Sequence, residues 1–330
     1  MKTNEHVGKI KGLVNGYKST YVIIAAARLG VFNALSTSPM TSAEVAAHIG
    51  VRAEKIDPVM NALVHFGVVE KKNEVFSLSE YKDVLDPNSP LCQLGYINHA
   101  LNMSDKWRKL EETVKSQEVS IDNFNGITGQ SEDQTRAFLQ AMNTNAVPQA
   151  EYLVSHYDFT DHKFIDIGAG YGTYSMRVAK AFETSKGVSL DLPMAAKIIA
   201  GNIEAENLSN RVKVIGGDYK KDLPNEKFND AFLFAIIHQE SIEECCKLIK
   251  SVFDILEDDG KLYLTSFFLN DDRTEPEFSV LFGIEMLVGS QNGRAYSHRE
   301  IRQILKDTGF RTVEAVKEVP GPATLYVATK

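Results

Sequence analysis

The stretch Phe164-Ile-Asp-Ile-Gly-Ala-Gly-Tyr-Gly172 decides how the second half of this 330-residue chain folds. It begins as an apolar run typical of a buried strand, continues into glycines at alternate positions, and is followed by a helical pattern opening at Thr173. Glycine lets a backbone come close to a ligand, and the first turn of a helix offers free N–H groups. We therefore expect a strand, a tight turn and a helix that together hold a nucleotide-like ligand.

Short apolar segments alternate with helical segments from residue 163 to the end of the chain. They read KFIDIGAG, KGVSLDL, RVKVIGG, FNDAFLFAII, GKLYLTSFF, TVEAVKEV and ATLYVAT. Strands that alternate with helices predict a parallel, doubly wound α/β sheet of the Rossmann-like type. Such a sheet binds its ligand at the carboxyl ends of its strands.

Acidic residues stand at the ends of three successive predicted strands, at Asp166, Asp191 and Asp218. A carboxylate at the second strand end can accept hydrogen bonds from both hydroxyls of a ribose, and one after the third can address an adenine. This set favours a nucleoside without a phosphate on its ribose, which points to S-adenosylmethionine (SAM). Thr173 stands where a dinucleotide fingerprint has its third glycine, so a dinucleotide-dependent dehydrogenase is disfavoured.

The first hundred residues predict a winged helix. Residues 20–35 form an apolar stretch typical of one largely buried helix. Thr41 and Glu44 make a capping-box pattern that opens a short helix. A further helix over residues 54–66 and a β-hairpin over residues 68–78 complete the arrangement.

The charge of the chain speaks against nucleic acid as a partner of this winged helix. The formal net charge is −8, whereas nucleic-acid affinity depends largely on Lys and Arg neutralising phosphates. The helix over residues 54–66 offers only Lys55 and His65 as positive groups. A packing or dimerisation role is therefore favoured.

The bulk properties predict a two-domain protein located in the cytoplasm. A length of 330 residues suits two domains, and no stretch reaches the roughly 18 uncharged apolar residues that would span a membrane. The spacing of Cys92, Cys245 and Cys246 fits neither a disulfide framework nor a zinc site. We expect packed thiols and no metal.

With these motifs, the chain resembles the SAM-dependent small-molecule O-methyltransferases of plants and bacteria. The resemblance covers nearly the whole chain and is specific at AARLGVFNAL, DIGAGYG, LDLP, GGDY, AFLFAIIHQES and LEDDGKLYL. It implies a winged-helix dimerisation domain over residues 1–100, a helical linker with acceptor-pocket helices over 101–155, and a Rossmann-like class I methyltransferase domain over 156–330. It also implies a homodimer, a small-molecule acceptor and S-adenosylhomocysteine (SAH) as a product.

The same similarity implies which residues form the site. Seven would contact SAM, namely Asp166, Gly168, Gly170, Asp191, Leu192, Asp218 and Tyr219. His238 would be the general base, because it follows the fourth strand at the carboxyl edge of the sheet. An imidazole with a pKa near neutrality can take a proton from a hydroxyl.

Two predicted helices carry residues that match positions lining the acceptor pocket of the family. Phe138 and Met142 lie on the helix before the methyltransferase domain, and Phe282, Glu285 and Met286 lie on a helix after the fifth strand. A carboxylate amid apolar neighbours faces either solvent or a ligand. If Glu285 faces a ligand, it favours a cationic or hydrogen-bond-donating group.

The surroundings of His238 depart from the family pattern. The family commonly reads His-Asp-Trp, whereas this chain reads His-Gln-Glu. Ser266 and Ala295 stand where the family has two carboxylates that orient the histidine. Either Glu240, Glu285 or another acid substitutes for them, or His238 is not a strong base because the acceptor does not need one.

Two alternatives to transfer to a hydroxyl oxygen stay open. The first is transfer to sulfur, nitrogen or carbon, since a small thiol, as its thiolate, or a thioether can attack the methyl group without a strong base. The second is a winged-helix regulator that senses SAM without chemistry. Such a regulator needs a basic recognition helix, which residues 54–66 do not supply.

Overall fold

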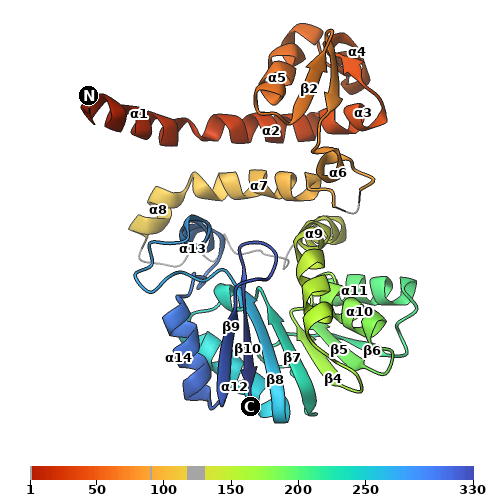
Figure 1. Ribbon diagram of the computed structural model, residues 1–330, viewed down its shortest axis with the longest axis vertical. Coiled ribbons are helices and arrows are strands. Elements are labelled where there is room, and N and C mark those ends of the chain that lie inside the picture. Colours follow the sequence, from red (N-terminus) through yellow and green to blue (C-terminus); the bar gives the residue numbers. More distant parts are fainter. Residues whose placement is uncertain (1, 90, 117–130) are drawn as a thin grey trace. The chain divides into compact units, whose positions relative to one another are not determined.

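Residues 2–89, 91–116 and 131–330 are described by a computed structural model, in which the chain divides into two compact units, Met1–Asn102 and Met103–Lys330 (Figure 1). Each unit has its own hydrophobic core.

The N-terminal unit combines helices with a small sheet. Its elements are α1 (Lys2–Asn15), α2 (Tyr17–Leu29), α3 (Val31–Thr37), β1 (Met40–Thr41), α4 (Ser42–Ile49), α5 (Ala53–His65), β2 (Val69–Lys72), β3 (Val75–Leu78), α6 (Lys82–Leu85) and α7 (Leu94–Trp107), which runs into the second unit. The strands form an antiparallel sheet in the order β1-β3-β2. The predicted capping box of Thr41 and Glu44 opens α4, and β2 and β3 pair as the predicted hairpin.

The prediction of one helix over residues 20–35 is wrong. Gly30, with a φ of 82°, ends α2 and begins α3. The apolar spacing continues across this glycine, so the periodicity alone could not reveal the break. The turn at Gly30 allows α3 to bury Phe32 and Leu35 in the same core as Phe76 of β3.

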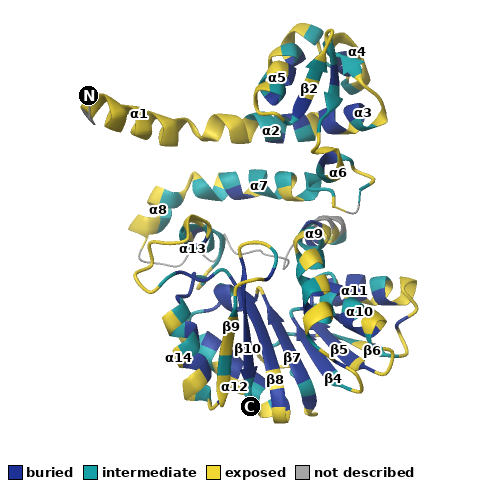
Figure 2. Ribbon diagram, in the orientation of Figure 1, coloured by how far each residue is buried: buried dark blue, intermediate teal, exposed yellow. Residues whose placement is uncertain are grey.

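Helix α1 is solvent-exposed at every residue from 3 to 15 (Figure 2). Among the described residues, no single helix has the length and apolar composition needed to cross a membrane. Thr3–Leu29 and Val31–Thr37 meet that requirement only when taken together, with a bend of 60° between them. The cytoplasmic location inferred from the sequence stays a prediction.

The C-terminal unit is built on a mostly parallel sheet. Its further elements are α8 (Leu110–Lys115), α9 (Glu132–His156), β4 (Lys163–Ile167), α10 (Thr173–Ala181), β5 (Lys186–Asp191), α11 (Pro193–Ala205), β6 (Val212–Gly216), β7 (Phe228–Phe234), the 3-10 turn η2 (Ile237–Gln239), α12 (Ile242–Ile255), β8 (Leu256–Ser266), α13 (Glu277–Gly289), α14 (His298–Thr308), β9 (Thr312–Val316) and β10 (Thr324–Thr329). The strand order is β6-β5-β4-β7-β8-β10-β9. Strands β4 to β8 are parallel, as predicted, and β10 runs antiparallel to both of its neighbours.

Alternating side chains cover the two faces of this sheet. On β7, Ala231 and Leu233 lie in a core shared with α12 and α14, whereas Phe232 and Phe234 lie in a core shared with α10 and α11. The strands are therefore buried on both sides, between two layers of helices (Figures 1 and 2). Cys245 of α12 is buried, and Cys92 and Cys246 are half-buried. Because β4 to β8 are parallel, their carboxyl ends all meet at one edge.

Replacing Gly30 by Ala tests the break between α2 and α3. A Cβ at Gly30 meets no atom closer than 3.9 Å, so the cost is that of a left-handed backbone. We expect Gly30→Ala to lower the free energy of unfolding by about 1 kcal/mol in urea denaturation. Gly8→Ala is the matched control, because Gly8 lies inside exposed α1 with no atom within 4 Å of an added Cβ. An equal effect of both substitutions would contradict the assignment.

Candidate active site

The glycine turn, residues 168–172, joins β4 to α10 and has a backbone that only glycine adopts readily. Gly168, Gly170 and Gly172 have φ values of 68°, 61° and 83°. A Cβ added at Gly168 would lie 2.2 Å from Cδ1 of Ile236, which follows β7. Gly172 is the N-cap of α10, so the free N–H groups of that helix begin at the turn. The turn therefore combines close backbone approach with hydrogen-bond donors.

Asp191, at the end of β5, is bonded to the glycine turn. Its carboxylate accepts hydrogen bonds from the backbone N–H of Gly170 and of Leu192, each at 2.7 Å. The side chain is buried, and burial raises the pKa of this carboxyl to about 6 in spite of the two hydrogen bonds. Each carboxylate oxygen of Asp191 accepts one of these two hydrogen bonds, so the carboxylate keeps lone pairs for a ligand hydroxyl.

Asp166 of β4 lies beneath the turn and is 1% exposed. Its carboxylate accepts hydrogen bonds from the backbone N–H and the hydroxyl of Ser175 on α10, at 3.3 and 2.8 Å. Ser189 of β5 extends this buried chain to the Ser175 hydroxyl at 2.7 Å. Burial raises the pKa of Asp166 to about 7. The side chain thus ties α10 to the sheet behind the turn.

Asp218 and Tyr219 follow β6 and have different surroundings. The Asp218 carboxylate accepts a hydrogen bond from the backbone N–H of Lys220 at 2.9 Å, which caps a local turn. The Tyr219 hydroxyl donates to Glu240 at 2.5 Å, and burial raises the pKa of that phenol. The other oxygen of Glu240 pairs with the Lys220 ammonium at 2.7 Å. Glu240 therefore connects the end of β6 to the segment that follows β7.

Helix α9 packs over the glycine turn. The hydroxyl of Thr173 donates to the side-chain oxygen of Asn143 at 2.5 Å. The methyl of Leu139 lies 4.0 Å from a Cβ placed on Gly170, and Phe138 packs beside Leu139. Met142, on the same helix, is half-buried. Both predicted acceptor residues of α9 are thus close in sequence to side chains that contact the turn.

His238 lies in η2, directly after β7, and is 7% exposed. Its Nδ1 lies 3.4 Å from the Ser266 hydroxyl at the end of β8. The Phe282 ring meets the imidazole edge to face, with 4.8 Å between ring centroids. The Phe267 ring lies roughly parallel to the imidazole, with 6.2 Å between ring centroids. Burial lowers the pKa of His238 to about 4. The imidazole is therefore neutral at physiological pH.

The segment before α14 holds the backbone of His238. The backbone N–H of Arg294 donates to the His238 carbonyl at 2.8 Å, and the Tyr296 hydroxyl donates to the Glu240 carbonyl at 2.8 Å. Ala295 between them is buried and lies 3.3 Å from a Cβ placed on Gly283 of α13. The η2 turn is thereby fixed from two sides.

Helix α13 carries the remaining predicted acceptor residues, all half-buried: Phe282, Glu285 and Met286. Glu285 has Lys106 of α7 as a charged neighbour, and the Lys106 ammonium donates to the Gly289 carbonyl at 3.5 Å. Burial raises the pKa of Glu285, and the nearby Lys106 charge partly offsets this rise. Burial lowers the pKa of Lys106, and the nearby Glu285 charge partly offsets this fall. This pair places opposite charges in a half-buried setting on the α13 side of the site.

The structure brings most of the predicted residues to the carboxyl edge of the sheet. Gly168 and His238 are linked through Ile236, and Gly170 and Asp191 are in direct contact. Partners that sequence reasoning did not single out include Ser175, Asn143, Phe267, Lys106 and Arg294. Ser175 follows the glycine turn by three residues, so its place in the motif was visible in the sequence whereas its hydrogen bond to Asp166 was not.

Comparison with known families decides what this site belongs to. Residues 107–311, more than half of the chain, match the O-methyltransferase domain, and residues 12–85 match the O-methyltransferase dimerisation domain. The chain belongs to this O-methyltransferase family.

Curated relatives match the methyltransferase over nearly its whole length. The S-adenosyl-L-methionine-dependent methyl transferase PigF of a Serratia species is 24% identical over 327 residues, covering 96% of this chain and 93% of PigF. The tetracenomycin polyketide synthesis 8-O-methyl transferase TcmO of Streptomyces glaucescens is 26% identical over 345 residues, covering 100% and 99%.

Solved structures share the fold of the methyltransferase. The structure of PigF with SAH has a TM-score of 0.88 at 23% identity and covers 98% of this chain and 99% of PigF. Human N-acetylserotonin methyltransferase in complex with SAM has a TM-score of 0.87 at 21% identity, covering 98% and 97%.

The chain is therefore a SAM-dependent methyltransferase with an N-terminal dimerisation domain. The residues at the glycine turn fit SAM, because Gly168, Gly170 and Gly172, the start of α10 and the Asp191 carboxylate lie together. Transfer to sulfur, nitrogen or carbon, a non-catalytic regulator and a dehydrogenase gain no support from the comparisons.

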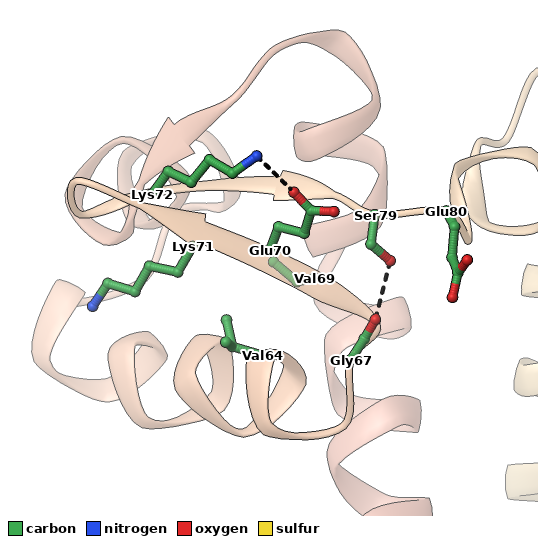
Figure 3. Close-up of a pocket in the computed structure, with 8 residues that line it drawn as sticks. All are labelled: Val64, Gly67, Val69, Glu70, Lys71, Lys72, Ser79 and Glu80. Carbon is green, nitrogen blue, oxygen red and sulfur yellow. Dashed lines mark hydrogen bonds and ion pairs between the residues drawn. The ribbon is translucent and has the colours of Figure 1, made fainter.

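A surface pocket on the N-terminal unit is unrelated to these residues (Figure 3). Lys72 pairs with Glu70 at 3.3 Å, and the Ser79 hydroxyl donates to the Gly67 carbonyl at 3.0 Å. The polar side chains of this pocket are exposed or half-buried. We assign no function to it. Its lining residues are Val64, Gly67, Val69, Glu70, Lys71, Lys72, Ser79 and Glu80.

Replacing Gly168 by Ala tests the geometry of the glycine turn. The new methyl would collide with Ile236, and the backbone would be held at a positive φ. We expect Gly168→Ala to lower the free energy of unfolding by about 2 kcal/mol or more, measured by chemical denaturation. Gly201→Ala in α11 is the control, since no atom lies within 4 Å of its Cβ. Equal stability of the two variants would show that the turn tolerates a side chain.

Proposed function

We propose that this methyltransferase transfers the methyl group of SAM to a hydroxyl oxygen of a small aromatic molecule, with His238 as the partner of that hydroxyl. The observation that carries the proposal is the position of the imidazole. It lies at the carboxyl edge of the sheet beside the rings of Phe267 and Phe282, two residues after the Ile236 side chain that packs under Gly168.

The cofactor is held by residues of three strand ends. Asp191 accepts the ribose hydroxyls, for which its carboxylate keeps free lone pairs beside Gly170 and Leu192. Asp218 and Tyr219, at the end of β6, flank the adenine. Gly168 and Gly170 allow the cofactor to lie against the backbone. Asp166 acts from below by holding α10 through Ser175.

Bound SAM supplies an electrophilic methyl group on a sulfonium. Transfer to an aligned oxygen is an in-line displacement, and most of its acceleration comes from holding the two reactants in that geometry. With SAM bound, His238 would hydrogen-bond to the acceptor oxygen and hold it in line with the methyl group. Nδ1 faces Ser266, so Nε2 is the nitrogen left for the acceptor.

Side chains of α9 and α13 form the acceptor site in this proposal. Phe138, Met142, Phe282 and Met286 provide apolar and aromatic surface, which suits a planar ring. Glu285 has a raised pKa because it is half-buried, and it can bind a hydrogen-bond donor of the acceptor. Its neighbour Lys106 balances the charge, so the acceptor need not be a cation.

The proposed roles of the three parts of the chain follow the domain boundaries predicted from the sequence. Residues 1–100 form the dimerisation domain, residues 101–155 supply the linker and acceptor helices, and residues 156–330 bind SAM. The match of residues 12–85 to a dimerisation domain supports a homodimer as the active form.

The proposed role of Asp191 makes SAM affinity depend on pH. The ionised carboxylate is the form that accepts ribose hydroxyls, and burial raises its pKa to about 6. The affinity for SAM is therefore highest above pH 6 and falls as the pH drops through this value. We expect SAM to bind about tenfold more weakly at pH 5 than at pH 7 by calorimetry.

Asp191→Asn removes the titrating group, so it should weaken SAM binding at pH 7 by at least about tenfold and lose the step near pH 6. Asp158→Asn, an exposed residue, is the control and should behave as the wild type. An Asp191→Asn variant with wild-type affinity would rule out the ribose contact.

The role of His238 is tested by its removal. We expect His238→Ala to reduce methyl transfer from labelled SAM to a cyano-substituted naphthol by about ten- to a hundredfold, since the hydrogen bond that positions the acceptor oxygen is lost. SAM affinity should stay unchanged, because His238 is placed on the acceptor side. His48→Ala, an exposed residue of α4, is the control. Turnover of His238→Ala at the wild-type rate would exclude His238 from the reaction.

A further inference from the structure

We propose, building on the proposed function, that the acceptor is a conjugated hydroxyl compound acidic enough to ionise near neutral pH, a phenol or enol with electron-withdrawing groups. The geometry that points to it is a His238 imidazole enclosed by aromatic rings and a serine hydroxyl, with no carboxylate bonded to it within the described residues.

Among the described residues, the side chains that hydrogen-bond to the imidazole or pack their rings on it are uncharged. Ser266 offers its hydroxyl to Nδ1 at 3.4 Å, at the end of β8. Phe267 follows Ser266 and stacks on the imidazole, and Phe282 of α13 meets it at right angles. From the segment before α14, Arg294 contributes its backbone N–H to the His238 carbonyl and not its guanidinium to the ring.

The charged groups on the surrounding elements have other partners. Glu240, two residues after His238, gives its oxygens to Tyr219 at 2.5 Å and Lys220 at 2.7 Å. The Arg294 guanidinium pairs with Glu300 at 2.7 Å.

Glu285 is the carboxylate of α13 that lies nearest in sequence to Phe282. It lies one turn beyond Phe282 on α13, and its charged neighbour is Lys106. Neither Glu240 nor Glu285 therefore takes over the orienting role that the sequence left open for them.

An imidazole in this setting is a poor base. A histidine serves as a strong general base when a carboxylate stabilises the imidazolium that forms, and a buried imidazolium without one is unfavourable. Burial lowers the pKa of His238 to about 4. Taking a proton from an ordinary phenol, with a pKa of about 10, would then be unfavourable by roughly a millionfold. An acceptor that ionises near pH 7 avoids this penalty.

Ser266 suits an ionised acceptor better than a carboxylate would. A hydroxyl can donate to Nδ1 or accept from it, whereas a carboxylate can only accept. When the Ser266 hydroxyl donates to Nδ1, the proton of the neutral imidazole resides on Nε2. That N–H can donate a hydrogen bond to a phenolate or enolate oxygen and aim it at the methyl carbon. His238 then positions the nucleophile rather than creating it.

The aromatic side chains beside His238 also favour a conjugated acceptor. Phe267 contacts Phe278 at 4.9 Å and Phe282 at 4.7 Å, so the rings beside His238 form one aromatic cluster. Planar conjugated molecules pack well on such rings. Conjugation also makes a hydroxyl acidic, because the charge of the anion is spread over the ring system. Shape and acidity thus select the same compounds.

The experiment measures methylation of a series of naphthols by the full-length wild-type enzyme with labelled SAM at pH 7. The series runs from unsubstituted through cyano- to nitro-substituted naphthol, in order of rising hydroxyl acidity. A naphthylmethanol, a naphthalenethiol and a naphthylamine serve as matched acceptors. We expect kcat/KM to rise at least about tenfold from the least to the most acidic naphthol, with no turnover of the naphthylmethanol.

Each other outcome overturns one of the two claims. If the naphthols are methylated on oxygen but kcat/KM stays constant or falls as hydroxyl acidity rises, the acidic-acceptor inference alone is contradicted. Turnover of the naphthylmethanol would contradict the same inference. Methyl transfer to the thiol or amine while every naphthol is inert contradicts the proposed function itself. Inertness of all acceptors in an enzyme that binds SAM contradicts the inference, because the acidic naphthols should react.

Variants at Ser266 separate a positioning role from a merely structural one. Ser266→Asp places a carboxylate at Nδ1 and should raise the pKa of His238 by at least about one unit, read from the imidazole NMR signal. The least acidic naphthol should then gain about tenfold in kcat/KM, which flattens the series. Ser266→Asn is the control of similar size without charge and should keep the wild-type slope.

A raised His238 pKa with an unchanged slope in Ser266→Asp would contradict the inference. Should Ser266→Asp not fold, as judged by its circular dichroism and thermal melt, the wild-type series decides alone.

Discussion

The hydrogen bond from the Gly170 N–H to the Asp191 carboxylate is the constraint on which the site depends. It fixes the turn after β4 to the end of β5, and it is possible because Gly170 adopts a positive φ. Gly168, earlier in the same turn, leaves room for Ile236, and His238 follows two residues later. One compact backbone arrangement therefore couples the proposed nucleoside site to the place where an acceptor would react. The buried Asp166–Ser175 contact supports that arrangement from below.

The fold could be predicted from the sequence wherever the signal was local. The capping box at Thr41, the apolar strand runs and the acidic strand ends depend on residues close in the chain, and the structure has them. The helix over residues 20–35 could not be divided, because its apolar spacing continues across Gly30. The antiparallel direction of β10 was equally hidden, since a strand buried on both faces has the same apolar pattern in either direction.

The sequence indicated which residues belong to the site, but it did not indicate which side chains bond to one another. The sequence indicated that Ser266 and Ala295 leave His238 without its usual acids, and it left Glu240 and Glu285 open as replacements. Only the folded chain shows that Glu240 bonds with Tyr219 and Lys220. Lys106 could not be paired with Glu285 in advance, because 179 residues separate them (285 − 106). Contacts of this kind depend on tertiary packing, which no local pattern encodes.

The proposed function requires that the cofactor and His238 share the carboxyl edge of the sheet. A crystal structure of the enzyme with SAH tests this requirement most directly. We expect the ribose hydroxyls to lie within hydrogen-bond distance of the Asp191 carboxylate, and the SAH sulfur to lie on the side of the site that His238 faces. Ribose hydroxyls bound elsewhere, or a sulfur turned away from His238, would contradict the proposed function.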